Sequence, residues 1–421
     1  MQAAMIHIRR ATYCIVFAIG AVSRSSAQTP ATHINVKPGE VVTVSDESLV
    51  LGVNPPIAYT GTPLPTLLTG NAASGLGRVT EHGALVAGSL IIKKGDRVLT
   101  RGKDYLLDPS WGTVGIGPTP SVTATETVTA SYRYALLRLD SIVKTKDGKE
   151  MVRTGVSHIT TPHPPDLQPG ETRIANILVP YNSDGTDAQV FPVVEDAAQA
   201  VTGSIAGRIP RTLAKLKAGL PVTIVTWGDS LTAGGDASTP YFRYPSVLER
   251  MLRAEYPKSD IHVVVAGAGG STSRQWLYPD KFPYGGPLSW GMVVASHPDL
   301  ITVEFSNDNF ITNPETLPAI YDDILGRIKA ADAEVILLTP SYMDFSLMHF
   351  TSYTDPDKRI IVSFYKQLAE QHHLALADDA ARWGHLYKEG IPYTTLLVNS
   401  YNHPDDRGHQ MFADELFKCF Q

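Results

Sequence analysis

The chain has 421 residues, which is enough for two domains with a hydrophobic core each. Hydrophobic residues make up 43% of it and charged residues 19%, a composition that excludes an intrinsically disordered protein. The formal net charge of −6 at pH 7 argues against nucleic-acid binding and against a basic patch for a membrane surface.

The first 27 residues are typical of a secretory signal peptide. Arg9 and Arg10 precede a short apolar run over 11–22, and small residues at 25–27 fit a cleavage site. The apolar run is short for a membrane span, although an uncleaved anchor stays open as the alternative. We therefore expect a secreted or periplasmic mature chain without a membrane span.

Residues 30–200 are predicted to form a β-rich accessory domain. Short β-branched runs separated by Gly, Pro and Asp occur at 41–44, 89–92 and 128–134. Asp147-Gly148, between the runs 140–144 and 150–152, is typical of a hairpin with a two-residue turn. This spacing favours a sandwich or a barrel. Polysaccharide binding, positioning of the next domain and assembly all stay open as roles for this region.

Residues 205–421 are predicted to form an α/β domain, with the boundary near 183–205 and a first helix over 209–216. Apolar runs alternate with helical patterns, and the expected strands are 222–227, 261–266, 300–305, 334–339 and 374–378. Five such runs indicate a parallel sheet with helices on both faces. Ligands of such sheets bind beyond the carboxyl ends of the strands.

Ser230 follows the first of these strands, among small residues and ahead of a helical pattern. The neighbouring glycines permit a sharp turn, and the free N–H groups of a following helix favour negative charge. A serine in this position is predicted to act as a nucleophile. A plain helix N-cap is the structural alternative.

Three further residues fall beyond other strands: Gly270, Asn307 and His403. A serine hydroxyl needs a base, and a neutral histidine can take its proton and later return it. His409 is the weaker alternative for this base. The backbone N–H groups of Ser230 and Gly270 and the amide of Asn307 would stabilise an oxyanion, with Asn309 as a rival for the amide. Asp229 is expected to bond neighbouring loop N–H groups.

These residues resemble the SGNH hydrolase family, also called GDSL esterases and lipases, over about residues 205–421. The matching blocks are Gly228-Asp229-Ser230-Leu231, 266–270, Ser306-Asn307-Asp308 and His403-Pro404. The resemblance implies a flavodoxin-like three-layer α/β/α sandwich with a five-stranded parallel sheet. It also implies ester hydrolysis without a metal or a cofactor, with Ser230, Gly270, Asn307 and His403 as the site residues.

Two positions depart from the family pattern. Phe305 stands where glycine is usual, and Ser400 stands where the family has the aspartate that orients the histidine. Losing that carboxylate in a serine protease costs about 10⁴-fold. We therefore expect a Ser-His dyad in which Ser400 or a backbone carbonyl orients His403. Asp405 or Asp406 reaching back, or a poor catalyst, are the alternatives.

Aromatic residues accompany the predicted site. The loop 341–353 is expected to form a pocket wall or a lid. Trp276, Tyr278 and Trp290 are candidates for stacking on a sugar ring, with plain packing as an equal alternative.

We therefore expect an exported serine esterase that hydrolyses small acyl esters, with acetyl esters on carbohydrate as the leading substrate. Its expected partner is a small-molecule or polysaccharide ester. A cell-surface carbohydrate-binding protein with a degenerate hydrolase domain, and an acyltransferase, are the other hypotheses.

Overall fold

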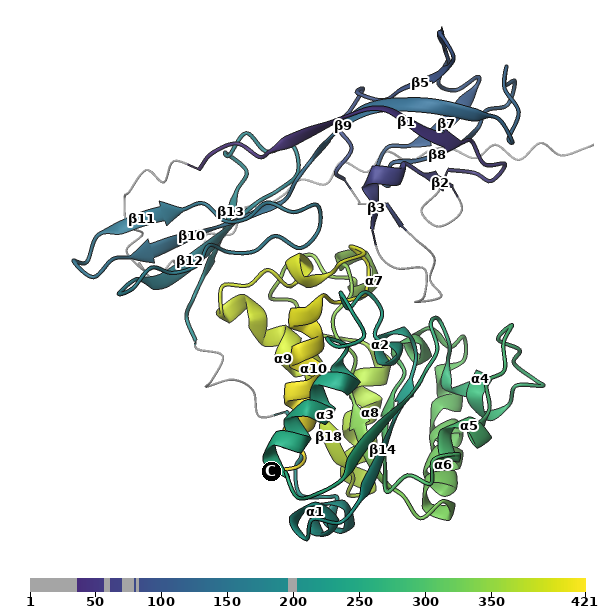
Figure 1. Cartoon of the computed structure of the whole chain (residues 1–421), viewed down its shortest axis with the longest axis vertical. Helices are drawn as coiled ribbons and strands as arrows, with labels where there is room; N and C mark the ends of the chain where they lie inside the picture. The colour runs from purple at the N-terminus through teal and green to yellow at the C-terminus, as the bar shows by residue number, and fades with distance from the viewer. Residues whose placement is uncertain (1–35, 57–60, 70–78, 81–82, 196–202) are drawn as a thin grey trace, which may run out of the picture. The chain divides into compact units, whose positions relative to one another are not determined.

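The computed structural model describes residues 36–421 apart from 57–60, 70–78, 81–82 and 196–202 (Figure 1). The predicted signal peptide lies outside the described residues. None of the helices in the described ranges combines the length and apolar character needed to cross a membrane.

The described residues between 41 and 192 form antiparallel sheets, as the β-branched runs predict. One sheet has the order β1-β9-β5-β6, with β1 (Val41–Val50), β9 (Thr127–Ala135), β5 (Ile91–Lys94) and β6 (Arg97–Val98). A second has the order β11-β10-β12-β13, with β11 (Glu150–Arg153), β10 (Arg138–Lys144), β12 (Thr172–Val179) and β13 (Gln189–Pro192). Smaller sheets pair β2 (Thr62–Pro63), β8 (Thr113–Ile116) and β7 (Tyr105–Asp108), and β3 (Leu68–Thr69) with β4 (Val79–Thr80).

The hairpin between β10 and β11 is present, but its turn differs from the two-residue turn expected from Asp147-Gly148. The Thr145 N–H donates to the Lys149 carbonyl at 2.9 Å, and the Gly148 N–H donates to the Thr145 carbonyl at 2.8 Å. Gly148 has φ +86°, the left-handed conformation that a longer hairpin connection with a bulge requires. The expected turn length is therefore wrong by one residue, because the Thr145–Lys149 pair closes the ladder.

The parallel sheet expected in the second half is confirmed. Its order is β15-β14-β16-β17-β18. The strands are β14 (Val222–Gly228), β15 (Ile261–Gly267), β16 (Leu300–Glu304), β17 (Glu334–Leu338) and β18 (Ala375–Ala377). β15 is added on one side of β14, and β16 and the later strands are added on the other side. The order in which strands are added therefore reverses beside β14. The carboxyl ends of β14 and β16 therefore meet at the position where such folds bind ligands.

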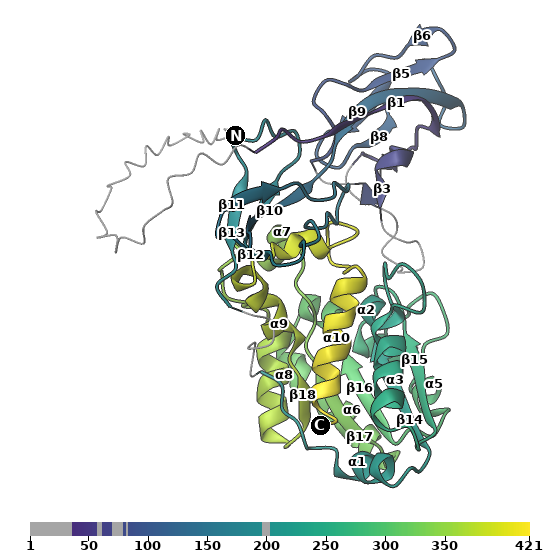
Figure 2. The ribbon, with the colours of Figure 1, turned by 60° about the vertical axis from the view of Figure 1, so that its left-hand side comes forward.

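Helices cover both faces of this sheet (Figures 1 and 2). Buried residues of α1 (Pro210–Lys217), α3 (Tyr244–Glu255) and α10 (Asp406–Lys418) share one hydrophobic cluster with the sheet. Residues of α4 (Ser273–Leu277), α5 (Trp290–Val294), α6 (Leu317–Ala330) and α8 (Ile360–Gln371) share another. The remaining α-helices of the described part are α2 (Ser230–Ala233), α7 (Phe345–Met348) and α9 (Asp379–His385). The result is the three-layer α/β/α sandwich that the sequence predicts.

Candidate active site

Ser230 is the first residue of α2, at the carboxyl end of β14. Asp229 precedes it as the N-cap, and its carboxylate accepts the Leu231 N–H at 3.1 Å. Gly228 permits close contact with β16, because an added Cβ would lie only 2.1 Å from the Glu304 carbonyl oxygen. The turn therefore holds Ser230 against the sheet, and its side chain is fully buried.

His403 lies next to Ser230. Its Nε2 is 2.9 Å from the Ser230 Oγ, and the ring is fully buried. Asn399 holds the loop that carries it, because its Oδ1 accepts the backbone N–H groups of Tyr401, Asn402 and His403 at 3.0, 2.9 and 3.0 Å. The geometry favours His403 over His409 as the base, since the ring nitrogens of His409 bond the Gly235 carbonyl and the Tyr244 N–H instead.

A carboxylate meets the other nitrogen of His403. The Nδ1 lies 2.8 Å from Oδ2 of Asp236, and both side chains are buried. Asp236 can only accept, so Nδ1 carries the proton and Nε2 is free to accept from the Ser230 hydroxyl. The expected dyad oriented by Ser400 or a backbone carbonyl is therefore wrong.

The other carboxylates considered from the sequence have different partners. Asp405 caps α10 through the N–H groups of Arg407 and Gly408, at 2.9 and 3.2 Å. Asp406 accepts the backbone N–H and the hydroxyl of Ser238, at 2.8 and 2.6 Å. Asp236 itself stands six residues after Ser230 in the turn before α3, with φ +61°. The only signal for it in the sequence is an aspartate after Gly234-Gly235.

Asp229 joins the nucleophile turn to the loop after β16, as expected. Its Oδ2 accepts the Ser306 hydroxyl at 2.7 Å and the Asn307 N–H at 2.9 Å. The Asn307 side-chain amide donates to the Ser271 carbonyl at 3.2 Å, and Ser271 directly follows Gly270. Gly270 has φ +71°, with no atom within 4 Å of the position of a Cβ. Asn307 and the Gly270 loop are thus brought together beside the turn that carries Ser230.

Buried acids lie beneath these loops. Burial raises the pKa of Glu304 well above its usual range, and the nearby negative charge of Asp229 adds to this effect. Burial also raises the pKa of Asp229, although the hydrogen bonds from Ser306, Asn307 and Leu231 act to lower it. Burial raises the pKa of Asp308 to about 6, although its carboxylate accepts the Ser273 N–H at 2.9 Å and the Tyr321 hydroxyl at 2.8 Å.

The tryptophans after β15 pack inside the domain. Trp276 is 2% exposed, and its indole N–H donates to the Ser271 hydroxyl at 3.0 Å. Trp276 and Trp290 contact Trp227 edge-on, with ring centroids 6.3 and 5.5 Å apart. The Tyr278 hydroxyl donates to Asp323 at 2.7 Å. Of the two interpretations of Trp276, packing is therefore the correct one.

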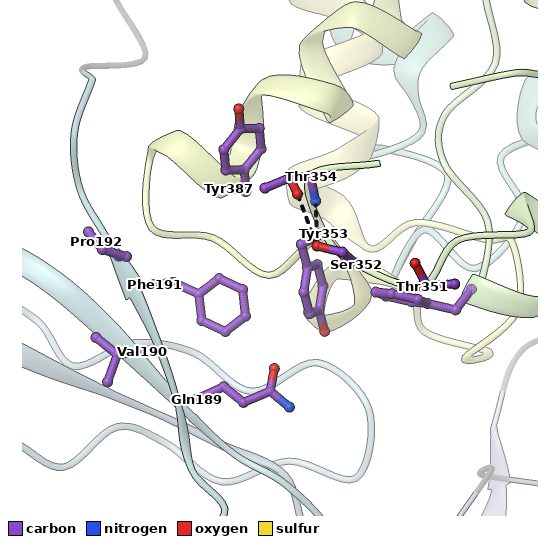
Figure 3. Close-up of a pocket in the computed structure, with 10 residues that line it drawn as sticks. Gln189, Val190, Phe191, Pro192, Thr351, Ser352, Tyr353, Thr354 and Tyr387 are labelled. Carbon is purple, nitrogen blue, oxygen red and sulfur yellow. Dashed lines mark hydrogen bonds between the residues drawn. The ribbon is translucent and has the colours of Figure 1, made fainter. Parts of the chain in front are cut away.

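The loop after β17 lines a cavity, as the sequence suggests. Phe345, Ser352 and Tyr353 come from this loop, while Phe191 belongs to β13 (Figure 3). The cavity has a volume of about 530 Å³, and its wall is completed by Gln189, Val190, Pro192, Thr351, Thr354 and Tyr387. Phe191 and Tyr353 meet edge-on, with ring centroids 4.9 Å apart. Tyr342 and Phe350 of the loop are buried in one hydrophobic cluster with Trp383 and Tyr393, and Phe345 and Tyr353 pack against this cluster, so the loop is a packed wall.

Within the described residues, no three His, Cys, Asp or Glu side chains are grouped so that they would hold a metal ion. The polar groups beside Ser230 instead form a series of hydrogen bonds, from the Asp236 carboxylate through the His403 ring to the Ser230 hydroxyl. This arrangement can withdraw a proton from the serine hydroxyl.

Residues 226–411 match the model of the GDSL-like Lipase/Acylhydrolase family. The match begins in β14 and ends in α10, so it includes Ser230, Asn307 and His403 together with Asp236. The match bears out the family resemblance expected from the sequence and supports a carboxylic ester hydrolase.

Solved structures resemble the chain over about half its length. A two-domain esterase active on acetylated mannans, co-crystallized with mannopentaose, is 19% identical over 50% of this chain and 51% of its own, with a TM-score of 0.40. The chain thus spans about half the length of that esterase. An acetylxylan esterase from Geobacillus stearothermophilus is 22% identical over 47% of this chain and 94% of its own, with a TM-score of 0.36. LAE5, an alpha/beta hydrolase enzyme from the metagenome of Lake Arreo, Spain, has the same identity and coverage and a TM-score of 0.37. None of the curated proteins matches the chain.

Proposed function

We propose that this protein is an exported serine esterase that hydrolyses small acyl esters on carbohydrate, with acetyl as the acyl group. The observation that carries the proposal is the buried chain of hydrogen bonds from Asp236 through His403 to Ser230, at 2.8 and 2.9 Å. A serine, its base and the carboxylate that orients the base are the parts that acyl transfer requires.

In the proposed reaction, the Ser230 Oγ attacks the acyl carbonyl carbon while Nε2 of His403 accepts the hydroxyl proton. Asp236 stabilises the positive imidazole that results. The negative oxygen of the tetrahedral intermediate would accept hydrogen bonds from the backbone N–H groups of Ser230 and Gly270 and from the Asn307 amide. His403 then protonates the leaving alcohol oxygen, and an acyl-enzyme remains.

Deacylation would use the same groups in the reverse roles. His403 takes a proton from a water molecule, and the resulting hydroxide attacks the acyl carbon. The ester bond to Ser230 breaks, the proton returns to the Ser230 oxygen, and the carboxylic acid leaves. The ester supplies the acyl group and one water molecule supplies the hydroxide and the returning proton, so both halves of the reaction balance.

Several features support a small acyl group and a carbohydrate alcohol. The side chains of Ser230 and His403 are fully buried, which favours a short acyl chain. The N-terminal 27 residues are typical of a signal peptide, and polysaccharide esters are substrates outside the cell. The cavity beside the loop 351–354 combines aromatic rings with hydroxyl and amide groups, which are the groups that sugars contact.

The alternative of a carbohydrate-binding protein with a degenerate hydrolase domain is now less well supported. It depended on Ser400 standing where the family has an aspartate, and Asp236 supplies a carboxylate to His403 from another part of the chain.

The function is tested with 4-nitrophenyl esters of increasing acyl length, followed by acetylated glycans. We expect the wild type to cleave the acetyl ester faster than the longer esters and to release acetate from a glycan. Ser230→Ala and His403→Ala should lose this activity. Equal, negligible rates in the wild type and in Ser230→Ala would contradict the proposal.

A further inference from the structure

His409 is a fully buried histidine in α10 that the proposed reaction does not use. Its Nδ1 lies 3.4 Å from the backbone N–H of Tyr244, and its Nε2 lies 3.1 Å from the Gly235 carbonyl oxygen. A backbone N–H can only donate, so Nδ1 is the unprotonated nitrogen. The proton is therefore on Nε2, which donates to Gly235. Burial lowers the pKa of His409 to about 4, in agreement with a neutral ring.

The Gly235 carbonyl belongs to the peptide bond that leads into Asp236. The orientation of this peptide sets the φ angle of Asp236, which is +61°. A left-handed conformation costs an aspartate about 1 kcal/mol, so contacts elsewhere must hold it in place. The hydrogen bond from His409 is one such contact, because it fixes the direction of the carbonyl.

The same segment lies directly against the His403 ring. A Cβ added to Gly235 would be 3.0 Å from Cε1 and 3.1 Å from Nδ1 of His403. The Gly235 N–H donates to the Ser230 carbonyl at 2.8 Å. Helix α10 also holds the next part of the loop, through the contacts of Asp406 with Ser238. A change in the Gly235 peptide would therefore displace Asp236 relative to His403.

We propose that His409 is a positioning residue, which holds the Asp236 carboxylate against His403 through the Gly235 carbonyl. This inference rests on the proposed function, since it gives His409 a part in the same site. The competing explanation is purely structural. The Tyr244 N–H lies at the start of α3, where the side chain of the N-cap residue Arg243 accepts no hydrogen bond, and His409 supplies the acceptor.

Two substitutions separate these roles. In His409→Asn the amide oxygen replaces Nδ1 and can accept from Tyr244, but the side chain is too short to reach Gly235. In His409→Gln the amide nitrogen replaces Nε2 and can donate to Gly235. We expect His409→Gln to keep kcat for 4-nitrophenyl acetate within about threefold. His409→Asn should lower kcat about 10- to 100-fold with KM nearly unchanged, the cost of a misplaced catalytic group.

A double-mutant cycle distinguishes the proposed role of His409 from a general loss of stability as the cause of a lower kcat. In the Asp236→Asn background the carboxylate is already absent, so His409→Asn should lower kcat less than about threefold further. Cys419→Ala is the matched control, because Cys419 is buried at the end of the same helix and contacts the carbonyls of Ile205 and Leu376. The proposal is overturned if His409→Asn keeps wild-type kcat, or if its effect is equal in both backgrounds.

NMR gives results that do not depend on esterase activity, and the first of them needs no variant. In the wild type, ¹⁵N spectra should show His409 protonated at Nε2 alone at pH 7, and a ring protonated at Nδ1 would overturn the proposal. The downfield proton of the His403 Nδ1–H bonded to Asp236 should persist in His409→Gln and disappear in His409→Asn. A wild type without esterase activity that passes both NMR tests would contradict the proposed function and leave the role of His409 intact.

Discussion

The carboxylate of Asp236 lies 2.8 Å from Nδ1 of His403, although 167 positions separate the two residues in the chain. In the family pattern the aspartate precedes the histidine by three residues, and here that position is Ser400. The same contact is made in this protein from the turn that follows the nucleophile. Ser230 and Asp236 therefore come from one loop, and His403 lies between them.

Asp236→Asn should remove most of the activity. An amide in this place favours the wrong imidazole tautomer and does not stabilise its positive form, a loss of about 10⁴-fold in serine proteases. The measurement is kcat on 4-nitrophenyl acetate at pH 7–8. Ser400→Gly is the control, since glycine tolerates the φ of +52° at this position, and it should retain kcat within about twofold. The reverse ranking of the two variants would restore Ser400 as the orienting group.

Asn307→Ala should slow acylation and leave substrate binding nearly intact. An amide donor that meets the oxyanion acts mainly in the transition state, and removing one costs about 10²- to 10³-fold in kcat. Steady-state kinetics should therefore show the loss in kcat, with KM changed little. Asn309→Ala, two residues further in the same loop, should behave like the wild type. Equal effects of both substitutions would indicate a disturbed loop in place of a lost donor.

Asn399→Ala should destabilise the protein. The Asn399 oxygen accepts three backbone N–H groups in the loop that carries His403, and Asn399 is 4% exposed. Each buried N–H left without an acceptor costs about 1–3 kcal/mol. Denaturant unfolding should show a loss of that size or more, together with reduced activity. Asn399→Asp keeps the oxygen and should lose less, so a larger loss in Asn399→Asp would contradict this account of the loop.

The titration of His409 should appear in the stability of the wild type. Its folded-state pKa of about 4 lies below the ordinary value of 6.5, so the unfolded chain binds the proton more readily. The contribution of the neutral ring is complete above pH 6.5 and is lost as the pH falls towards 4. Between pH 7 and pH 5 the wild type should lose about 2 kcal/mol more than His409→Gln does. Parallel stability curves for the two proteins would refute the assignment.

The titration of Asp308 should change the free energy of unfolding with pH in the opposite direction. Its folded-state pKa of about 6 lies above the ordinary value of 3.8, so its contribution is present below pH 3.8 and is lost as the pH rises through 6. Asp308→Asn removes this titration. The free energy of unfolding of this variant, relative to the wild type, should therefore rise by about 1 kcal/mol from pH 5 to pH 7. If this difference in the free energy of unfolding fell from pH 5 to pH 7, burial would not raise the pKa of the Asp308 carboxyl.

The parallel sheet could be predicted because its strands are buried on both faces. Runs such as 222–227 and 300–305 consist mostly of apolar or β-branched residues, and the structure places strands there within one residue. Ser230 and His403 could be predicted because each stands in a family motif beyond the sheet. The structure places their side chains 2.9 Å apart, while their catalytic roles and the oxyanion roles of Gly270 and Asn307 stay predictions.

Asp236, Asn399 and Trp276 could not be assigned in this way. Asp236 lies in a turn without periodicity, and only the folded path of α2, α3 and α10 brings it to His403. The role of Asn399 depends on the backbone of its own loop, which no residue pattern specifies. Trp276 suits both a sugar platform and a core, and its place depends on how Trp227 packs against it. For Asp236 and Trp276 the deciding contact joins segments distant in sequence, whereas for Asn399 it depends on the backbone conformation of a single loop.

The central claim is that the Ser230 hydroxyl is a nucleophile activated by His403. It is tested most directly by incubating the protein with a fluorophosphonate and locating the adduct by mass spectrometry. The account predicts one adduct per chain on Ser230, with labelling strongly slowed in His403→Ala and absent in Ser230→Ala. Labelling of a different residue, or equal labelling rates in the wild type and His403→Ala, would contradict it.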